Sequence, residues 1–116
     1  MSRTILFVCE HGAFRSRIAA AYFNATGPVG WRALSAGRDP QLSASPRLVA
    51  LLAATAAGDY LETETPRGTE NVTADRVIAI DCVVTGAEQW MTKGGSDEAL
   101  RDEIATRVGL LARELE

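Results

Sequence analysis

A short apolar run near the start of the chain does most to limit how this protein can fold. Residues Thr4-Ile5-Leu6-Phe7-Val8 are almost continuously apolar. Such a run is typical of a central parallel strand, because both faces of that strand are covered by other parts of the protein. We therefore expect this segment to lie inside a parallel sheet.

The rest of the chain alternates between strand-like and helix-like segments, which favours a parallel sheet flanked by helices. Further strands are predicted over residues 30–34, 76–80 and 89–92, and the polar segment 58–74 is predicted to be mainly loop. The expected fold is α/β: one three-layer domain spanning residues 1–116, with a central four-stranded parallel sheet flanked by helices.

Three helices are predicted from the spacing of apolar residues. The first covers residues 16–25. The second begins at Ser45-Pro46, where the serine caps the helix, and its apolar face extends to Thr55. The third follows the break at Gly94-Gly95-Ser96. Its predicted buried stripe consists of Leu100, Ile104, Val108, Leu111 and Leu115.

Composition narrows the functional classes. The 116 residues are 47% hydrophobic and 23% charged with a net charge of -3, which fits one globular domain and argues against a nucleic-acid partner. No apolar run reaches the roughly 18 residues that a membrane span needs. The first apolar run ends too early for a signal peptide. With two cysteines and one histidine, neither a disulfide framework nor a zinc site is expected. We expect a reduced, cytoplasmic protein without metal, cofactor or membrane partner.

The segment from Cys9 to Ser16 carries the candidate chemistry. Cys9 ends the first predicted strand, and Arg15 follows after five residues, where a helix begins. A loop of this length can turn backbone N–H groups inward and, with the positive end of the helix, form a nest for a tetrahedral oxyanion. Arg15 can add a bidentate contact to that anion. The same field favours the thiolate of Cys9, and Ser16 can donate its hydroxyl to the sulfur.

This Cys-x5-Arg-Ser pattern between a first strand and a first helix resembles the phosphate-binding loop of the low-molecular-weight protein tyrosine phosphatases. Thioredoxin-coupled arsenate reductases share that fold. The likeness continues in Ala19-Ala20-Ala21, in Ser35-Ala36-Gly37 and in residues 75–81, but residues 58–71 lie outside it. The resemblance implies a phosphotyrosine phosphatase I-like domain over residues 1–116.

The resemblance also implies an activity: hydrolysis of phosphotyrosine or small aryl phosphates through a thiophosphate intermediate. Cys9 would be the nucleophile, Arg15 the anion clamp and Ser16 the donor to the thiolate. The implied partner is a phosphorylated protein or a small phosphate or arsenate oxyanion. The phosphate-binding loop would consist of Glu10, His11, Gly12, Ala13, Phe14, Arg15 and Ser16.

The sequence departs from the family at two positions. The general acid of the family lies in an Asp-Pro pair after the fourth strand, and no such pair occurs there. Asp97 is the best substitute, although beside Ser96 it also suits the positive end of the last helix. Gly12 stands where the phosphatases carry an asparagine that braces the loop against Ser35. Slower chemistry or a looser pocket is the expected consequence, with Phe14 placed to narrow the entrance.

Two other functions stay open. Arsenate reductases of this fold use a second cysteine near the end of the third strand, where Cys82 falls one residue late and Asp81 takes the expected place. Cys82 also suits a half-buried structural thiol. A reductase that relies on thioredoxin or a small external thiol would need only Cys9. The last alternative is a non-catalytic oxyanion-binding module that has the loop but lacks the acid.

Overall fold

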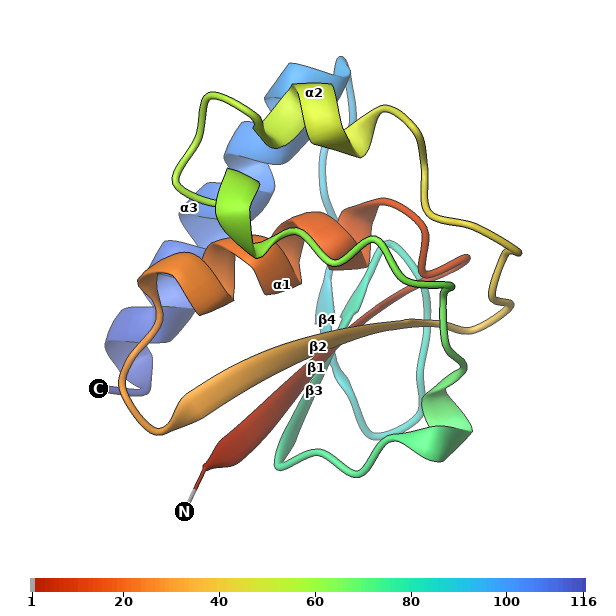
Figure 1. Ribbon diagram of the computed structural model, residues 1–116. Coiled ribbons are helices and arrows are strands. Elements are labelled where there is room, and N and C mark those ends of the chain that lie inside the picture. Colours follow the sequence, from red (N-terminus) through yellow and green to blue (C-terminus); the bar gives the residue numbers. More distant parts are fainter. Residues whose placement is uncertain (1) are drawn as a thin grey trace.

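The computed structural model describes residues 2–116, apart from the side chain of Asn71. Its centre is a four-stranded parallel sheet with the strand order β2-β1-β3-β4 (Figure 1). The strands are β1 (Arg3–Cys9), β2 (Trp31–Gly37), β3 (Arg76–Ile80) and β4 (Glu88–Trp90). Strand β1 lies between two neighbours, which explains its nearly continuous apolar sequence.

The register of the sheet brings the carboxyl ends of its strands together. Cys9 pairs with Gly37 of β2, and Val8 pairs with Ala36 of β2 on one side and Ala79 of β3 on the other. In open parallel sheets, ligands bind at this edge, outside the carboxyl ends of the strands. The predicted nucleophile therefore lies where such a fold offers a site.

All three α-helices pack on one face of the sheet (Figure 1). They are α1 (Arg15–Thr26), α2 (Leu48–Leu52) and α3 (Asp97–Glu114). Their apolar side chains, among them Ile18, Leu52 and Ile104, form one buried cluster with Ile5 and Phe7 of β1. This cluster is the main core of the protein.

The opposite face of the sheet is covered by irregular segments. Leu6 and Val8 of β1 point to that face, because they alternate with Ile5 and Phe7, and they pack there with Val72 and Val84 from two loops. The predicted sheet and helices are confirmed, but the third layer of the domain consists of loops rather than helices.

Several predicted boundaries need correction. Strand β2 extends to Gly37 instead of ending at residue 34, and β4 starts and ends earlier than predicted. Helix α2 is shorter at both ends than the apolar spacing suggested. It starts later because Ser45 and Pro46 belong to a turn, in which the Ser45 hydroxyl accepts a hydrogen bond from the Arg47 amide. It ends early because the Thr55 hydroxyl donates to the carbonyl of Leu52.

The segment predicted as loop contains two single turns of 3₁₀ helix, η1 (Gly58–Tyr60) and η2 (Thr69–Asn71). The last helix begins after Ser96 as predicted, and Leu100, Ile104, Val108 and Leu111 are buried along it, with Leu115 partly buried. Across the described part of the chain, no helix has the length and apolar character to cross a membrane.

Candidate functional site

The loop between β1 and α1 turns its carbonyl groups outward. The carbonyls of residues 9–13 all accept hydrogen bonds from outside the loop, at N···O distances of 2.7–3.1 Å. The donors are the backbone amides of Arg38, Asp39, Gln41 and Ser45 and the side chain of Arg17. The loop is thus held from outside by the segment that follows β2 and by one side chain of α1.

The amides of the loop consequently point to its inside. In a trans peptide the N–H points opposite to the preceding C=O, and no peptide bond among the described residues is cis. The amides of residues 10–15 donate to no acceptor in the described part of the chain. Unpaired, inward-pointing amides next to a helix N-terminus form a nest for an anion.

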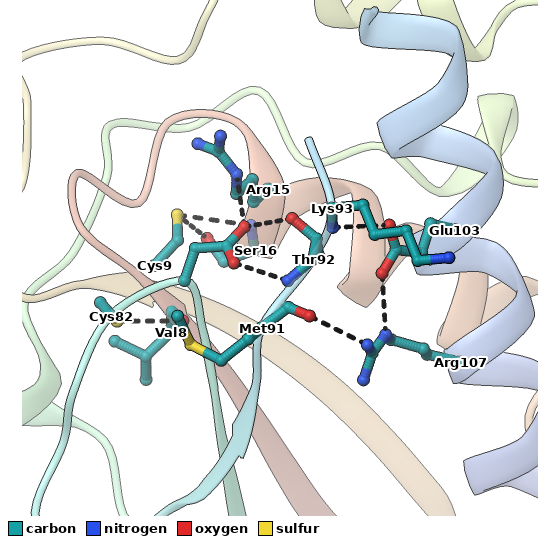
Figure 2. Close-up of polar contacts among 11 residues, drawn as sticks. Val8, Cys9, Arg15, Ser16, Cys82, Met91, Thr92, Lys93, Glu103 and Arg107 are labelled. Carbon is teal, nitrogen blue, oxygen red and sulfur yellow. Dashed lines mark hydrogen bonds and ion pairs between the residues drawn. The ribbon is translucent and has the colours of Figure 1, made fainter. Parts of the chain in front are cut away.

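Cys9 lies at the base of this nest. Its side chain is almost completely buried, and its Sγ lies 3.1 Å from the Oγ and 3.4 Å from the amide nitrogen of Ser16 (Figure 2). When the sulfur is a thiolate, both groups of Ser16 can donate to it and so stabilise the negative charge. Ser16 is fully buried in the first turn of α1, which fixes both donors.

Arg15 contacts Asp81, a residue that follows β3 and binds Thr92 after the end of β4. The Nε of Arg15 lies 3.0 Å from Oδ2 of Asp81, but its N–H is not directed at a hydrogen-bond acceptor. The contact is therefore an ion pair rather than a hydrogen bond. The Asp81 carboxylate also accepts from the amide of Thr92 at 2.7 Å and from the Thr92 hydroxyl. Asp81 itself has a φ of 54°, in the left-handed region that few residues other than glycine adopt.

A pocket of about 310 Å³ opens above the loop. Cys9, Arg15 and Phe14 lie on its loop side, and its opposite wall comes from residues 41–47. The Arg47 guanidinium stacks on the Phe14 ring, with its carbon 4.4 Å from the ring centroid. Phe14 thus lines the pocket, and no pattern in the sequence indicated that Arg47 would stack on it.

The structure places Asp97 in the first turn of α3, after Ser96, whose Oγ accepts from the amide of Ala99. The two carboxylate oxygens of Asp97 lie 2.6 and 2.7 Å from a guanidinium nitrogen of Arg47. Asp97 thus does not line the pocket itself but contacts Arg47, which does. Among the described carboxylates, Glu10 alone lines the pocket, and it pairs with Arg38.

Gly12 braces the loop through its backbone instead of a side chain. It has a φ of 64°, and a Cβ at this position would lie 2.7 Å from the backbone nitrogen of Gly37. A Cβ on Gly37 would in turn lie 2.5 Å from the nitrogen of Gly12. The two glycines allow the loop and β2 to meet backbone to backbone, and this contact takes the space that an asparagine side chain would need.

Arg17, which follows the predicted motif, was not anticipated as a site residue. It is 3% exposed, and its guanidinium donates to the carbonyl of Gly12 at 2.8 Å and to those of Glu62 and Glu64. Burial lowers the pKa of Arg17, and the nearby Glu62 carboxylate opposes that effect. The sequence feature that could have indicated this role was a charged residue directly beside the apolar face of the first helix.

His11 of the loop and Cys82, which follows β3, each make a local contact. Nδ1 of His11 lies 3.1 Å from the carbonyl oxygen of Asp39, a contact that braces the loop. Cys82 is buried with its Sγ 3.6 Å from the carbonyl oxygen of Val8 (Figure 2). Burial raises the pKa of the Cys82 thiol, and the neighbouring Cys9 adds to the effect.

Solved structures provide the comparison with known proteins. An arsenate reductase from Archaeoglobus fulgidus superposes with a TM-score of 0.77 and 28% sequence identity, over 94% of this chain and 98% of the other. The arginine phosphatase YwlE from Geobacillus stearothermophilus gives 0.73 and 23%, over 97% and 92%. No protein-family model and no curated protein sequence matches the chain.

A third structure is longer than this chain. A thioredoxin-dependent arsenate reductase from Corynebacterium glutamicum gives a TM-score of 0.75 at 22% identity, over 97% of this chain but only 61% of the other. These similarities agree with the four-stranded parallel sheet and the helices described above. The chain belongs to the superfamily of low-molecular-weight protein tyrosine phosphatases and arsenate reductases.

Proposed function

We propose that this protein is a cysteine-dependent phosphatase that hydrolyses phosphotyrosine or small aryl phosphates through a thiophosphate on Cys9. One observation carries the proposal. Cys9 lies at the base of a loop whose unpaired amides point inward, and Arg15 lines the same pocket. Donors arranged in advance around a transferring phosphoryl group stabilise the charge that develops on its oxygens.

The proposed reaction has two steps. The Cys9 sulfur attacks phosphorus, the bond from phosphorus to the aryl oxygen breaks, and that oxygen leaves with the electron pair and takes a proton. Water then attacks phosphorus, the S–P bond breaks, and Ser16 stabilises the thiolate that returns. Asp97 is the proposed proton donor. It has to exchange its contact with Arg47 for the leaving group.

The size of the pocket supports a substrate with an organic group. About 310 Å³ is at the lower end of the range for small-molecule sites and leaves room beyond the nest itself. The Phe14 ring provides an apolar wall. A phosphorylated protein side chain or a small aryl phosphate fits this description. The similarity to an arginine phosphatase makes phosphoarginine a third substrate to test.

Arsenate reduction is the second candidate, and the position of Cys82 favours it. This thiol contacts the carbonyl of Val8, the residue next to the proposed nucleophile. In the reaction, arsenate bound to Cys9 would accept two electrons and leave as arsenite, while two thiols become a disulfide. Those thiols would be Cys9 itself and either Cys82, thioredoxin or a small thiol. The similarity to the Archaeoglobus fulgidus arsenate reductase supports this candidate.

Parallel assays distinguish the candidates. Hydrolysis of p-nitrophenyl phosphate, phosphotyrosine or phosphoarginine that is lost in Cys9→Ser supports the phosphatase. Thiol-dependent arsenite production that is lost in the same variant supports the reductase, and Cys82→Ser then shows whether the second thiol is internal. Phosphate binding without either turnover contradicts both activities and supports a non-catalytic oxyanion-binding module.

The role of Asp97 is tested with two leaving groups. Because p-nitrophenol leaves more easily than phenol, it depends less on protonation. Asp97→Asn should therefore lower kcat more for phenyl phosphate than for p-nitrophenyl phosphate. Arg47→Gln, which removes the partner of Asp97 but leaves the carboxylate, is the matched control and should lack this difference. An equal loss of kcat for both substrates in Asp97→Asn would contradict the role.

A further inference from the structure

Arg17 occupies an unusual place for a charged residue. It lies in the first turn of α1, is 3% exposed, and is not among the residues that line the pocket. Burying a charge is costly unless the charge is paired and hydrogen-bonded. The contacts that compensate this burial therefore show what the side chain does.

The guanidinium joins two segments that are far apart in the sequence. Its Nε donates to the Gly12 carbonyl at 2.8 Å, and its two terminal nitrogens donate to the carbonyls of Glu62 and Glu64. Because the donors of a guanidinium form a rigid planar fork, the two carbonyls of residues 62–64 fix the plane of the group. The Nε–H is then directed at the carbonyl of Gly12.

The contact with Gly12 determines where the next amide points. The peptide between Gly12 and Ala13 is trans, so holding the Gly12 carbonyl outward turns the Ala13 N–H inward. The other outward carbonyls of residues 9–13 are held by backbone amides. Only the Gly12 carbonyl is held by a side chain, and Gly12 has the least restricted backbone of the loop.

We infer that Arg17 is a positioning residue that directs the Ala13 amide toward the bound oxyanion. The carbonyls of Glu62 and Glu64 hold the Arg17 guanidinium in the orientation that this requires. The inference rests on the oxyanion chemistry proposed above and assigns a role to the segment from residue 62 to residue 64. It predicts that Arg17 contributes to anion affinity without touching the anion. The contribution comes from the orientation of the Ala13 N–H and not from the positive charge of the guanidinium.

Phosphate binding tests the inference without any turnover. The full chain labelled with ¹⁵N is titrated with inorganic phosphate and followed by NMR. In the wild type the Ala13 amide should shift on binding. In Arg17→Gln and in Arg17→Lys the phosphate Kd should rise about tenfold, as expected for a lost hydrogen bond to a charged group, and the Ala13 shift should shrink. The lysine keeps the charge without the fork, so wild-type affinity in Arg17→Lys would overturn the inference.

Arg67 supplies the matched control. It contacts the carboxylates of Glu62 and Glu64 and the carbonyl of Ser35, but no carbonyl of the loop. Arg67→Gln should lower the Tm while the phosphate Kd stays within twofold of the wild type, on the order of experimental scatter. If Arg67→Gln weakens phosphate binding as much as Arg17→Gln, the effect is general loosening of the segment and the inference is wrong.

A wild-type measurement covers the case in which the Arg17 variants do not fold. A scalar coupling across the hydrogen bond should connect Nε of Arg17 with the Gly12 carbonyl carbon. Absence of that coupling, or an Ala13 amide that phosphate does not shift, would overturn the inference. Failure of the proposed function looks different: phosphate binds and shifts Ala13, but no substrate turns over.

Discussion

Two glycines determine how closely the loop between β1 and α1 approaches β2. In Gly12→Ala the new Cβ would lie 2.7 Å from the nitrogen of Gly37, on a backbone with a φ of 64°. Left-handed backbone costs an L-residue roughly 1–2 kcal/mol, and overpacking costs about 1–3 kcal/mol more. We expect the free energy of unfolding to fall by about 2–5 kcal/mol, as measured by urea denaturation, and phosphate affinity to fall with it.

Gly86 offers a control with the same backbone strain and no clash. Its φ is 80°, and no atom lies within 4 Å of the position where its Cβ would be. Gly86→Ala should therefore show only the backbone cost of roughly 1–2 kcal/mol and bind phosphate like the wild type. Equal losses of stability in the two variants would mean that the contact between Gly12 and Gly37 is not what makes the loop sensitive.

The hydroxyl of Ser16 can be tested through catalysis. Ser16→Ala removes the Oγ that lies 3.1 Å from the Cys9 sulfur but keeps the amide contact at 3.4 Å. A hydrogen bond to a charged group contributes about 1.5–3 kcal/mol, so kcat for p-nitrophenyl phosphate should fall at least about tenfold. Ser43→Ala, on the opposite wall of the pocket, is the control. An unchanged kcat in Ser16→Ala would show that the thiolate does not depend on this donor.

At the scale of single residues, the sequence predicts which residues meet when local spacing alone brings them together. Cys9 ends β1, and Arg15 and Ser16 begin α1 after a short loop, so the local chain is enough to bring them together. Arg17 and Arg47 gain their roles from partners about 45 and 50 residues away, Glu62 and Asp97. Local spacing holds no information about such pairs.

Helix α3 shows how one capping residue positions a charged pair. Ser96 accepts a hydrogen bond from the Ala99 amide, which starts the helix where Asp97 can reach Arg47. Ser96→Ala should lower the free energy of unfolding by about 1 kcal/mol, measured by urea denaturation. Ser96→Thr keeps an oxygen at the cap and should lose only a few tenths of that amount. A loss as large in Ser96→Thr would rule out capping as the cause.

Among the elements, apolar periodicity together with end signals predicted the last helix correctly but was not sufficient for α2. The last helix has both Ser96 at its start and an apolar stripe, and its start and buried face were predicted. Helix α2 had the same kinds of signal, but it covers only Leu48–Leu52. Its first residues instead form part of the pocket wall, where Arg47 meets Phe14 and Asp97. Tertiary contacts outweighed the local preference for a longer helix.

For the whole molecule, the sheet could be predicted from the sequence, but the segments that cover each of its faces could not. The strands were recognisable from their own sequences, and four parallel strands imply that both faces are covered. Which segments cover each face depends on contacts between distant residues, such as Val72 and Val84 with Leu6 and Val8. The apolar residues of these loops are too few and too irregularly spaced to reveal the face they cover.

Anion binding should stabilise the whole molecule, because the loop joins β1, α1 and the segment after β2. A ligand that binds only the folded chain adds RT ln(1 + [L]/Kd) to its stability, about 2.7 kcal/mol at 100 times Kd. For a domain of this size, phosphate at that concentration should raise the Tm by about 10 °C. Arg15→Gln, which lacks the guanidinium proposed to bind the anion, should show a much smaller rise in Tm. The wild type in sodium chloride of equal ionic strength should also show a much smaller rise. A rise of the same size in chloride would mean that salt screens charges elsewhere on the surface, and that phosphate does not stabilise the fold through the loop.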